Sequence, residues 1–191
     1  MNQSKKSMNP VDNGINQIIL TLVVAIGILF SFFFVGKSSS DIKITTQING
    51  DKTLEYKNTT RQFSILYPED LSFKEYDEGG GTYTIVFEEK TDSTSSPQAA
   101  DKGFQIFFTP YSEPQVSPER FLLDVPSGVR KDVLNLEVDG VLGTSFSSTN
   151  ASLGETWEVW FIHDGYLFEL TTLKPLENLL DEIVQTWKFT R

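Results

Sequence analysis

The stretch TWEVWFIHDGYLFELTT, residues 156–172, decides the fold of this chain. Apolar and polar residues alternate on both sides of Asp164-Gly165, and that dipeptide can supply the positive φ angles of a two-residue hairpin turn. Such a turn fixes the register, so Phe161 lies opposite Phe168 on a face that is predicted to be core. The stretch therefore predicts an antiparallel hairpin with at least one buried face.

Alternation of the same kind continues outward along the chain. The further strands that it predicts are residues 63–67, 82–88, 104–109, 133–138 and 141–146. A weaker hairpin is predicted upstream, where residues 44–48 and 53–56 flank Asn49-Gly50. An isolated hairpin is marginal in water, so this one would have to dock on the rest of the domain.

Two segments carry the period of a helix. Ser117-Pro118-Glu119 is a typical helix start, because Ser caps free amides and Pro fits the first turn, and Pro126-Ser127-Gly128 should end that helix. One apolar stripe predicts a closing helix, formed by Leu176, Leu179, Leu180, Ile183, Val184 and Trp187. This order of elements favours an α+β domain, with helices packed on the faces of a mainly antiparallel central sheet.

The composition excludes several classes of site. The 191 residues include no cysteine, which removes disulfides, thiolate metal sites, cysteine nucleophiles and lipoprotein acylation. The net charge is −10, and residues 57–191 alone carry 22 acidic against 11 basic side chains, or −11. A surface this acidic repels phosphate backbones and argues against nucleic-acid binding. It suits solubility, or attraction to a basic partner or to cations.

An apolar stretch near the N-terminus predicts a membrane-spanning helix over residues 15–35. At 1.5 Å per residue it would be about 30 Å long, which matches the hydrocarbon core of a bilayer. The membrane-spanning positions that we single out are Ile15, Ile18, Leu22, Ile26, Leu29, Phe32 and Val35. The run is longer than the apolar region of a cleaved signal peptide, so an uncleaved signal anchor is favoured.

This span divides the chain into four parts. They are a short tail (1–14), the transmembrane helix (15–35), a polar linker (36–56) and the folded domain (57–191). A short tail is more easily retained in the cytoplasm than a large domain, so the expected topology is single-pass. The N-terminus would be cytoplasmic and the C-terminal domain extracytoplasmic.

No residue pattern amounts to an active site. His163 is the single histidine, and zinc sites need several such ligands, so neither a catalytic residue, a metal ligand nor a cofactor is predicted. The neighbouring carboxylates Glu88 and Glu89 would point to opposite faces of a strand. The candidate partner-binding residues are Trp160, His163, Tyr166 and Glu169. Trp160 is core if a helix covers its face of the hairpin, and a binding anchor if none does.

Three motifs carry a family resemblance. They are FSILYP (63–68), GYLFELTT (165–172) and the closing helix with its exit (179–189), which ends in Thr186-Trp187-Lys188-Phe189. In their order and spacing, residues 57–191 resemble the PsbP family and the wider Mog1/PsbP-like fold. One departure is Leu71-Ser72, where many relatives have Trp after Tyr-Pro. A second is the spanning helix, in place of a transit peptide or lipid anchor.

The resemblance implies both a fold and a role. The fold would be an α/β/α sandwich around an antiparallel sheet. Family members are non-enzymatic extrinsic accessory proteins, some of which help to assemble or stabilise photosystem II and retain its calcium and chloride. The leading hypothesis is therefore a membrane-anchored extracytoplasmic module that docks on an envelope or membrane protein complex. The alternative is an envelope protein that binds a small molecule or lipid. A photosystem II assembly factor and a carboxylate-based hydrolase rank below both.

Overall fold

The computed structural model describes residues 47–48, 51–90 and 102–190. The predicted span (15–35), the tail before it and most of the linker lie outside the described residues. Within the described part, none of the helices has both the length and the apolar character needed to cross a membrane. The chain divides into units 1–38 and 39–191, and every described residue belongs to the second.

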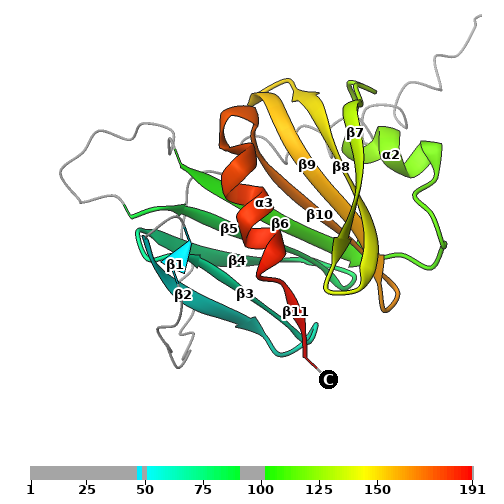
Figure 1. Cartoon of the computed structure of the whole chain (residues 1–191). Helices are drawn as coiled ribbons and strands as arrows, with labels where there is room; N and C mark the ends of the chain where they lie inside the picture. Colours follow the sequence, from blue (N-terminus) through cyan, green and yellow to red (C-terminus); the bar gives the residue numbers. More distant parts are fainter. Residues whose placement is uncertain (1–46, 49–50, 91–101, 191) are drawn as a thin grey trace, which may run out of the picture. The chain divides into compact units, whose positions relative to one another are not determined.

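Two antiparallel sheets make up most of this unit (Figure 1). The large sheet has the strand order β4 (Leu71–Gly79), β5 (Thr82–Glu89), β6 (Gly103–Pro110), β10 (Tyr166–Leu173), β9 (Gly154–His163), β8 (Val141–Asn150) and β7 (Lys131–Val138). The small sheet has the order β1 (Gln47–Ile48), β2 (Asp51–Asn58), β3 (Phe63–Pro68) and β11 (Lys188–Phe189). Strands β4 and β7 are thus the two edges of the large sheet.

The predicted hairpin registers are confirmed. Phe161 pairs with Phe168, and Trp160 pairs with Glu169 on the opposite face of the large sheet. The upstream hairpin is also present, since Ile48 pairs with Asp51 across a two-residue connection. Its longer strand, β2, pairs with β3 from Thr53 onward. The hairpin therefore docks on the rest of the domain, as expected for a hairpin that is marginal by itself.

The helices are fewer and shorter than a sandwich of helix layers requires. They are α2 (Pro118–Asp124) and α3 (Glu177–Gln185), with a 3₁₀ turn, η2 (Lys174–Leu176), leading into α3. At the start of α2, the Ser117 hydroxyl accepts a hydrogen bond from the Arg120 amide at 3.1 Å, which is the predicted cap. Helix α3 turns Leu180, Ile183 and Val184 into the core.

The expected α/β/α sandwich is therefore wrong, because the described residues form two packed antiparallel sheets with only two α-helices. The layer expected to be helical is mainly the small sheet, with α3 beside it (Figure 1). Two long strands caused the error. β2 lies across the predicted linker boundary, and β4 is exposed along most of its length, so neither has the clear apolar alternation of a half-buried strand.

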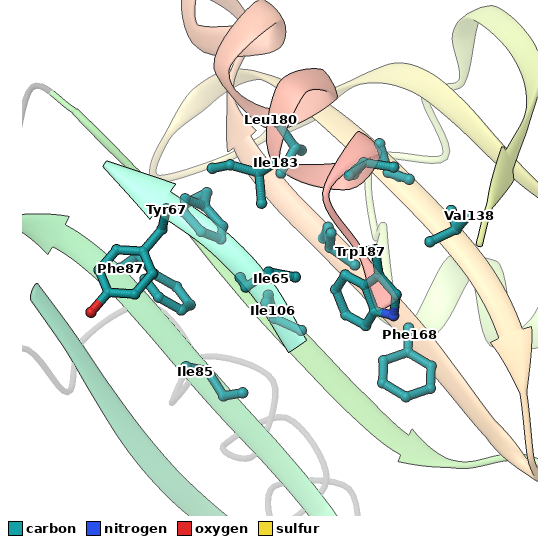
Figure 2. Packing of buried hydrophobic residues seen from close by; sticks show 14 of the residues in the cluster. Ile65, Tyr67, Ile85, Phe87, Ile106, Val138, Phe168, Leu180, Ile183 and Trp187 are labelled. Carbon is teal, nitrogen blue, oxygen red and sulfur yellow. The ribbon is translucent and has the colours of Figure 1, made fainter. Parts of the chain in front are cut away.

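The main core lies between the large sheet on one side and the small sheet with α3 on the other. Figure 2 shows Ile65 and Tyr67 of β3, Ile183 of α3 and Phe87 of β5 pointing into this space. Trp187, just after α3, is 1% exposed and fills the centre of the core. This arrangement ties the two sheets and the closing helix into one unit.

Candidate functional site

The large sheet separates the four candidate binding residues into two pairs. His163 and Tyr166 flank the β9–β10 turn and line a hollow at that end of the domain. Trp160 and Glu169 point to the other face, beneath α2. The four residues therefore do not form one site, and each pair has its own surroundings.

Trp160 belongs to a second, smaller core. It is 5% exposed and buried with Val125, Phe146 and Leu167. Its ring lies 5.6 Å from that of Phe121, which α2 contributes. A helix thus covers this face, which was the condition under which Trp160 would be core.

Glu169 lies in a buried cluster of charged side chains that also includes Arg120 and Asp124 of α2. Arg120 Nη2 donates to Asp124 Oδ1 at 2.8 Å and to Glu169 Oε1 at 3.4 Å, so one guanidinium links two carboxylates. Burial raises the pKa of Glu169 well above its usual range, and the negative charge of Asp124 adds to the effect. Burial also raises the pKa of Asp124. The cluster joins the short helix to β10.

Glu158 is a second buried carboxyl on this face. It is 6% exposed and accepts hydrogen bonds from the hydroxyls of Thr156 at 2.7 Å and Thr171 at 2.6 Å. No cation pairs with it among the described residues, and burial raises its pKa. Glu158 and Glu169 therefore both favour the protonated form more than a glutamate in water does.

The hollow at the β9–β10 turn has two adjoining parts, with cavity volumes of about 240 Å³ and 470 Å³. Both are lined by Arg61, Gln62, His163 and Asp164. We call this pair of hollows the Arg61 cleft. It brings the turn between β2 and β3 beside the turn between β9 and β10, about a hundred residues later in the chain.

Arg61 is the central side chain of the cleft. Its guanidinium carbon lies 3.8 Å from the centre of the Tyr166 ring, 5.7 Å from that of Phe108 and 6.0 Å from that of Tyr83. Its single hydrogen bond from the side chain within the described residues runs from Nη2 to the carbonyl of Gly81, at 3.4 Å. Aromatic rings, rather than an acid, therefore surround this cation.

The other wall of the cleft is fixed by β11. The His163 ring stacks on that of Phe189 with 3.8 Å between centroids. Asp139 accepts hydrogen bonds from Lys188 Nζ at 2.8 Å and from the Phe189 amide at 2.9 Å. The Lys188 ammonium and the Phe189 amide hold the pKa of Asp139 below its usual range. Asp139 is thus already paired on its own side of the cleft.

Possible metal ligands do not cluster in the described part of the chain. No set of three His, Asp or Glu side chains among them is close enough to hold a metal ion. Glu88 forms an ion pair with Lys74, while Glu89, the next residue, is exposed. The carboxylates considered from the sequence therefore have separate surroundings.

A second surface stands out by its exposed apolar side chains. Seven large hydrophobic residues are exposed in the described part, and all but Tyr76 lie between residues 122 and 153. These six define the α2–β7 surface: Leu122 and Leu123 on α2, Val133 and Leu134 on β7, Leu142 on β8, and Leu153 in the β8–β9 turn. Leu142 is 82% exposed, which makes it the most exposed of the set.

Comparisons with known proteins find several similar solved structures. No family model and no curated protein matches the chain. The chain is similar to the solution structure of cyanobacterial PsbP (CyanoP) from Synechocystis sp. PCC 6803, with 15% sequence identity and a TM-score of 0.44. The match covers 84% of this chain and 98% of that one. At that score, the similarity carries no conclusion about what this chain binds or does.

The sequence alone did not reveal Arg61 or the α2–β7 surface. Arg61 looks like an ordinary turn residue, and its contact with Tyr166 depends on how the two sheets pack. Leu134 and Leu142 follow normal strand alternation, and only the strand order shows that no described strand lies on the outer side of β7. Neither feature has a local signal.

Proposed function

We propose that this chain is a membrane-anchored, non-enzymatic accessory protein whose acidic domain docks on a membrane protein complex. The observation that carries the proposal is the α2–β7 surface. An open sheet edge lies there among exposed leucines, whereas the rest of the described surface carries a single exposed large apolar residue. Exposed apolar side chains beside an unpaired strand edge favour an interaction site at that edge.

The two edges of the large sheet differ in a way that supports this choice. Proteins usually protect an edge strand with charges, because its free backbone groups can pair with another strand. β4 carries four charged residues, Lys74, Glu75, Asp77 and Glu78. β7 carries three, Lys131, Asp132 and Glu137, all towards its ends, and its four central residues, 133–136, carry none. β7 is therefore the edge suited to pairing with a partner.

The partner's chemistry follows from both backbone and charge. An extended segment could add to β7 through main-chain hydrogen bonds and place apolar side chains against Leu134. Because the domain has a net charge of −11 over residues 57–191, basic residues beside that segment would be attracted to it. The partner segment would be an extended, apolar strand of a membrane protein, with Lys or Arg next to it.

The anchor would keep the domain close to such a partner. The apolar stretch 15–35 is long enough to cross a bilayer, and the short tail before it would remain in the cytoplasm. Tethering raises the effective concentration of the domain near membrane complexes, so even weak docking would be productive. The linker and the domain would then lie on the extracytoplasmic side.

Site-specific photocrosslinking tests the proposal. A photoreactive amino acid is placed at Leu134 on β7 in the full-length protein, and the matched control carries it at Tyr76 on β4. Both sites are exposed strand positions at opposite edges of the same sheet. After irradiation of native membranes, the proposal expects a discrete membrane protein crosslinked from position 134 and not from position 76. Equal crosslinking from both positions, or none from 134, contradicts it.

A further inference from the structure

We propose that the Arg61 cleft is a binding site for a carboxylate group. The proposal goes beyond the docking role, because it uses none of the residues of the α2–β7 surface. It rests on the free donors of Arg61, the ring that orients it and the hollow in front of it.

Most of the hydrogen-bonding capacity of Arg61 is unused. A guanidinium has five N–H donors. The structure gives the Arg61 side chain one acceptor, the carbonyl of Gly81, and the distance of 3.4 Å makes that bond weak. Arg61 forms no ion pair with any described residue, although the domain has twice as many acids as bases. Its donors therefore lack the partner that an arginine normally finds.

Tyr166 holds the guanidinium without using those donors. At 3.8 Å from the ring centre, the cation lies over the ring, and this contact uses none of its N–H donors. Nε is buried without an acceptor among the described residues, so the two Nη groups are the donors open to a ligand. A planar fork of this kind matches the two oxygens of a carboxylate. Phe108 and Tyr83 lie at about 6 Å and limit the directions that the guanidinium can take. The cation is thus oriented before any ligand arrives.

The other groups facing the cleft fit a small anion. The charge of Asp139 is already matched by Lys188 and the Phe189 amide. Asp164 is exposed at the tip of its turn, where solvent screens its charge. Thr60 adds a hydroxyl, and His163 adds a ring N–H donor.

Two sources could supply the carboxylate: a free small acid, or the C-terminus or an acidic side chain of a protein. The test uses the full-length protein in detergent, isotopically labelled at arginine, with NMR signals of the arginine Nε–H groups as the readout. The chain has four arginines, so the signals can be assigned by substitution. The probes are acetate, a short peptide with a free C-terminal carboxylate, the same peptide as its amide, and sulfate.

Arg130 provides the matched control. Its guanidinium also lies over aromatic rings, 5.1 Å from Phe146 and 5.7 Å from Phe121, but it lines neither part of the cleft. The proposal expects a saturable shift of the Arg61 signal with acetate or the free-acid peptide, and none with the amide. Arg61→Gln and Arg61→Lys lack the reporting signal, so their binding of the same probes is measured by titration calorimetry, and each should bind about tenfold more weakly or worse, since each removes the fork. Arg130→Gln should leave it unchanged.

Each outcome bears on the site. Binding of acetate and peptide alike assigns the site to the carboxylate alone, while binding of the peptide only shows that the ligand is a protein segment. Shifts of Arg61 and Arg130 that are equal and never saturate would overturn the proposal, because they would report general ion binding. Sulfate binding as tightly as acetate would overturn the carboxylate assignment. An unchanged Arg130 signal in the Arg61 variants shows that they remain folded.

Discussion

Replacing Trp187 tests the account of how the two sheets are joined. The ring of Trp187 stacks on that of Phe63 at 4.3 Å and meets those of Phe161 and Phe168 edge-on at 5.2 Å and 5.7 Å. It therefore contacts β3 of the small sheet and both central strands, β9 and β10, of the large one. Substitution of this side chain should weaken all three contacts together.

The expected loss of folding stability follows from the buried area of the Trp187 ring and from its unpaired indole N–H. A buried indole covers about 200 Å², which at about 25 cal/mol per Å² corresponds to about 5 kcal/mol. The Trp187 indole N–H has no acceptor among the described residues. Removing this buried, unpaired donor therefore offsets the loss by about 1–2 kcal/mol. Trp187→Ala should thus lower the free energy of unfolding by about 3–4 kcal/mol. Trp187→Phe, which keeps a ring against Phe63, should lower it by about 1 kcal/mol.

Urea unfolding of the full-length protein in detergent, followed by circular dichroism, measures both changes. Trp157→Phe is the control, because the Trp157 indole donates to Asp181 at 2.9 Å. Its loss should cost about 1 kcal/mol more than Trp187→Phe. The reasoning fails if Trp187→Phe costs as much as Trp187→Ala, or if alanine costs less than about 1 kcal/mol.

Three further predictions address pH, the β11 strand and α2. Because burial raises the pKa of Glu158, the folded state binds this proton more tightly, and stability falls as pH rises from about 4.5 through the raised pKa. Glu158→Gln should remove that slope, at most about 1.4 kcal/mol per pH unit, in urea titrations at several pH values. Asp139→Ala should speed hydrogen exchange at the Phe189 amide, because it removes the acceptor of that amide. An unchanged exchange rate there would contradict this hydrogen bond. Ser117→Ala should cost about 1 kcal/mol in thermal unfolding by removing the cap of α2, whereas no change would mean that α2 needs no cap.

The central hairpin could be predicted because local chemistry decides it. Asp139 and Asp164 both adopt the positive φ angles that their turns require, and each is followed by glycine. Period-two alternation then sets the register by itself, as the Phe161–Phe168 pair shows. Where a turn and an alternating pattern agree, the sequence is sufficient.

The rest of the fold depends on contacts between distant segments. Most of β4 is exposed, so its sequence has no buried face to give it a pattern, and its pairing with β5 holds it in place. β11 has two residues and forms only because Trp187 and α3 bring it beside β3. The expected helix layers failed for this reason: strands supported by partners leave little trace in the local sequence.

The candidate sites show the same division. The two-residue turn register that pairs Phe161 with Phe168 also places His163 opposite Tyr166, as in the structure. Arg61 reaches Tyr166 only because the small sheet packs on the large one, and no local sequence pattern predicts that packing. The exposure of Leu134 depends on strand order, a property of the whole sheet.

The most direct test of the docking role is quantitative recovery of partners from native membranes. Full-length protein carrying Leu134→Asp is compared with the unaltered protein and with Tyr76→Asp, which places the same charge on the opposite edge of the sheet. The account predicts that a membrane protein recovered with the unaltered chain is also recovered with Tyr76→Asp and is lost with Leu134→Asp. Equal recovery with all three proteins would contradict docking through the α2–β7 surface.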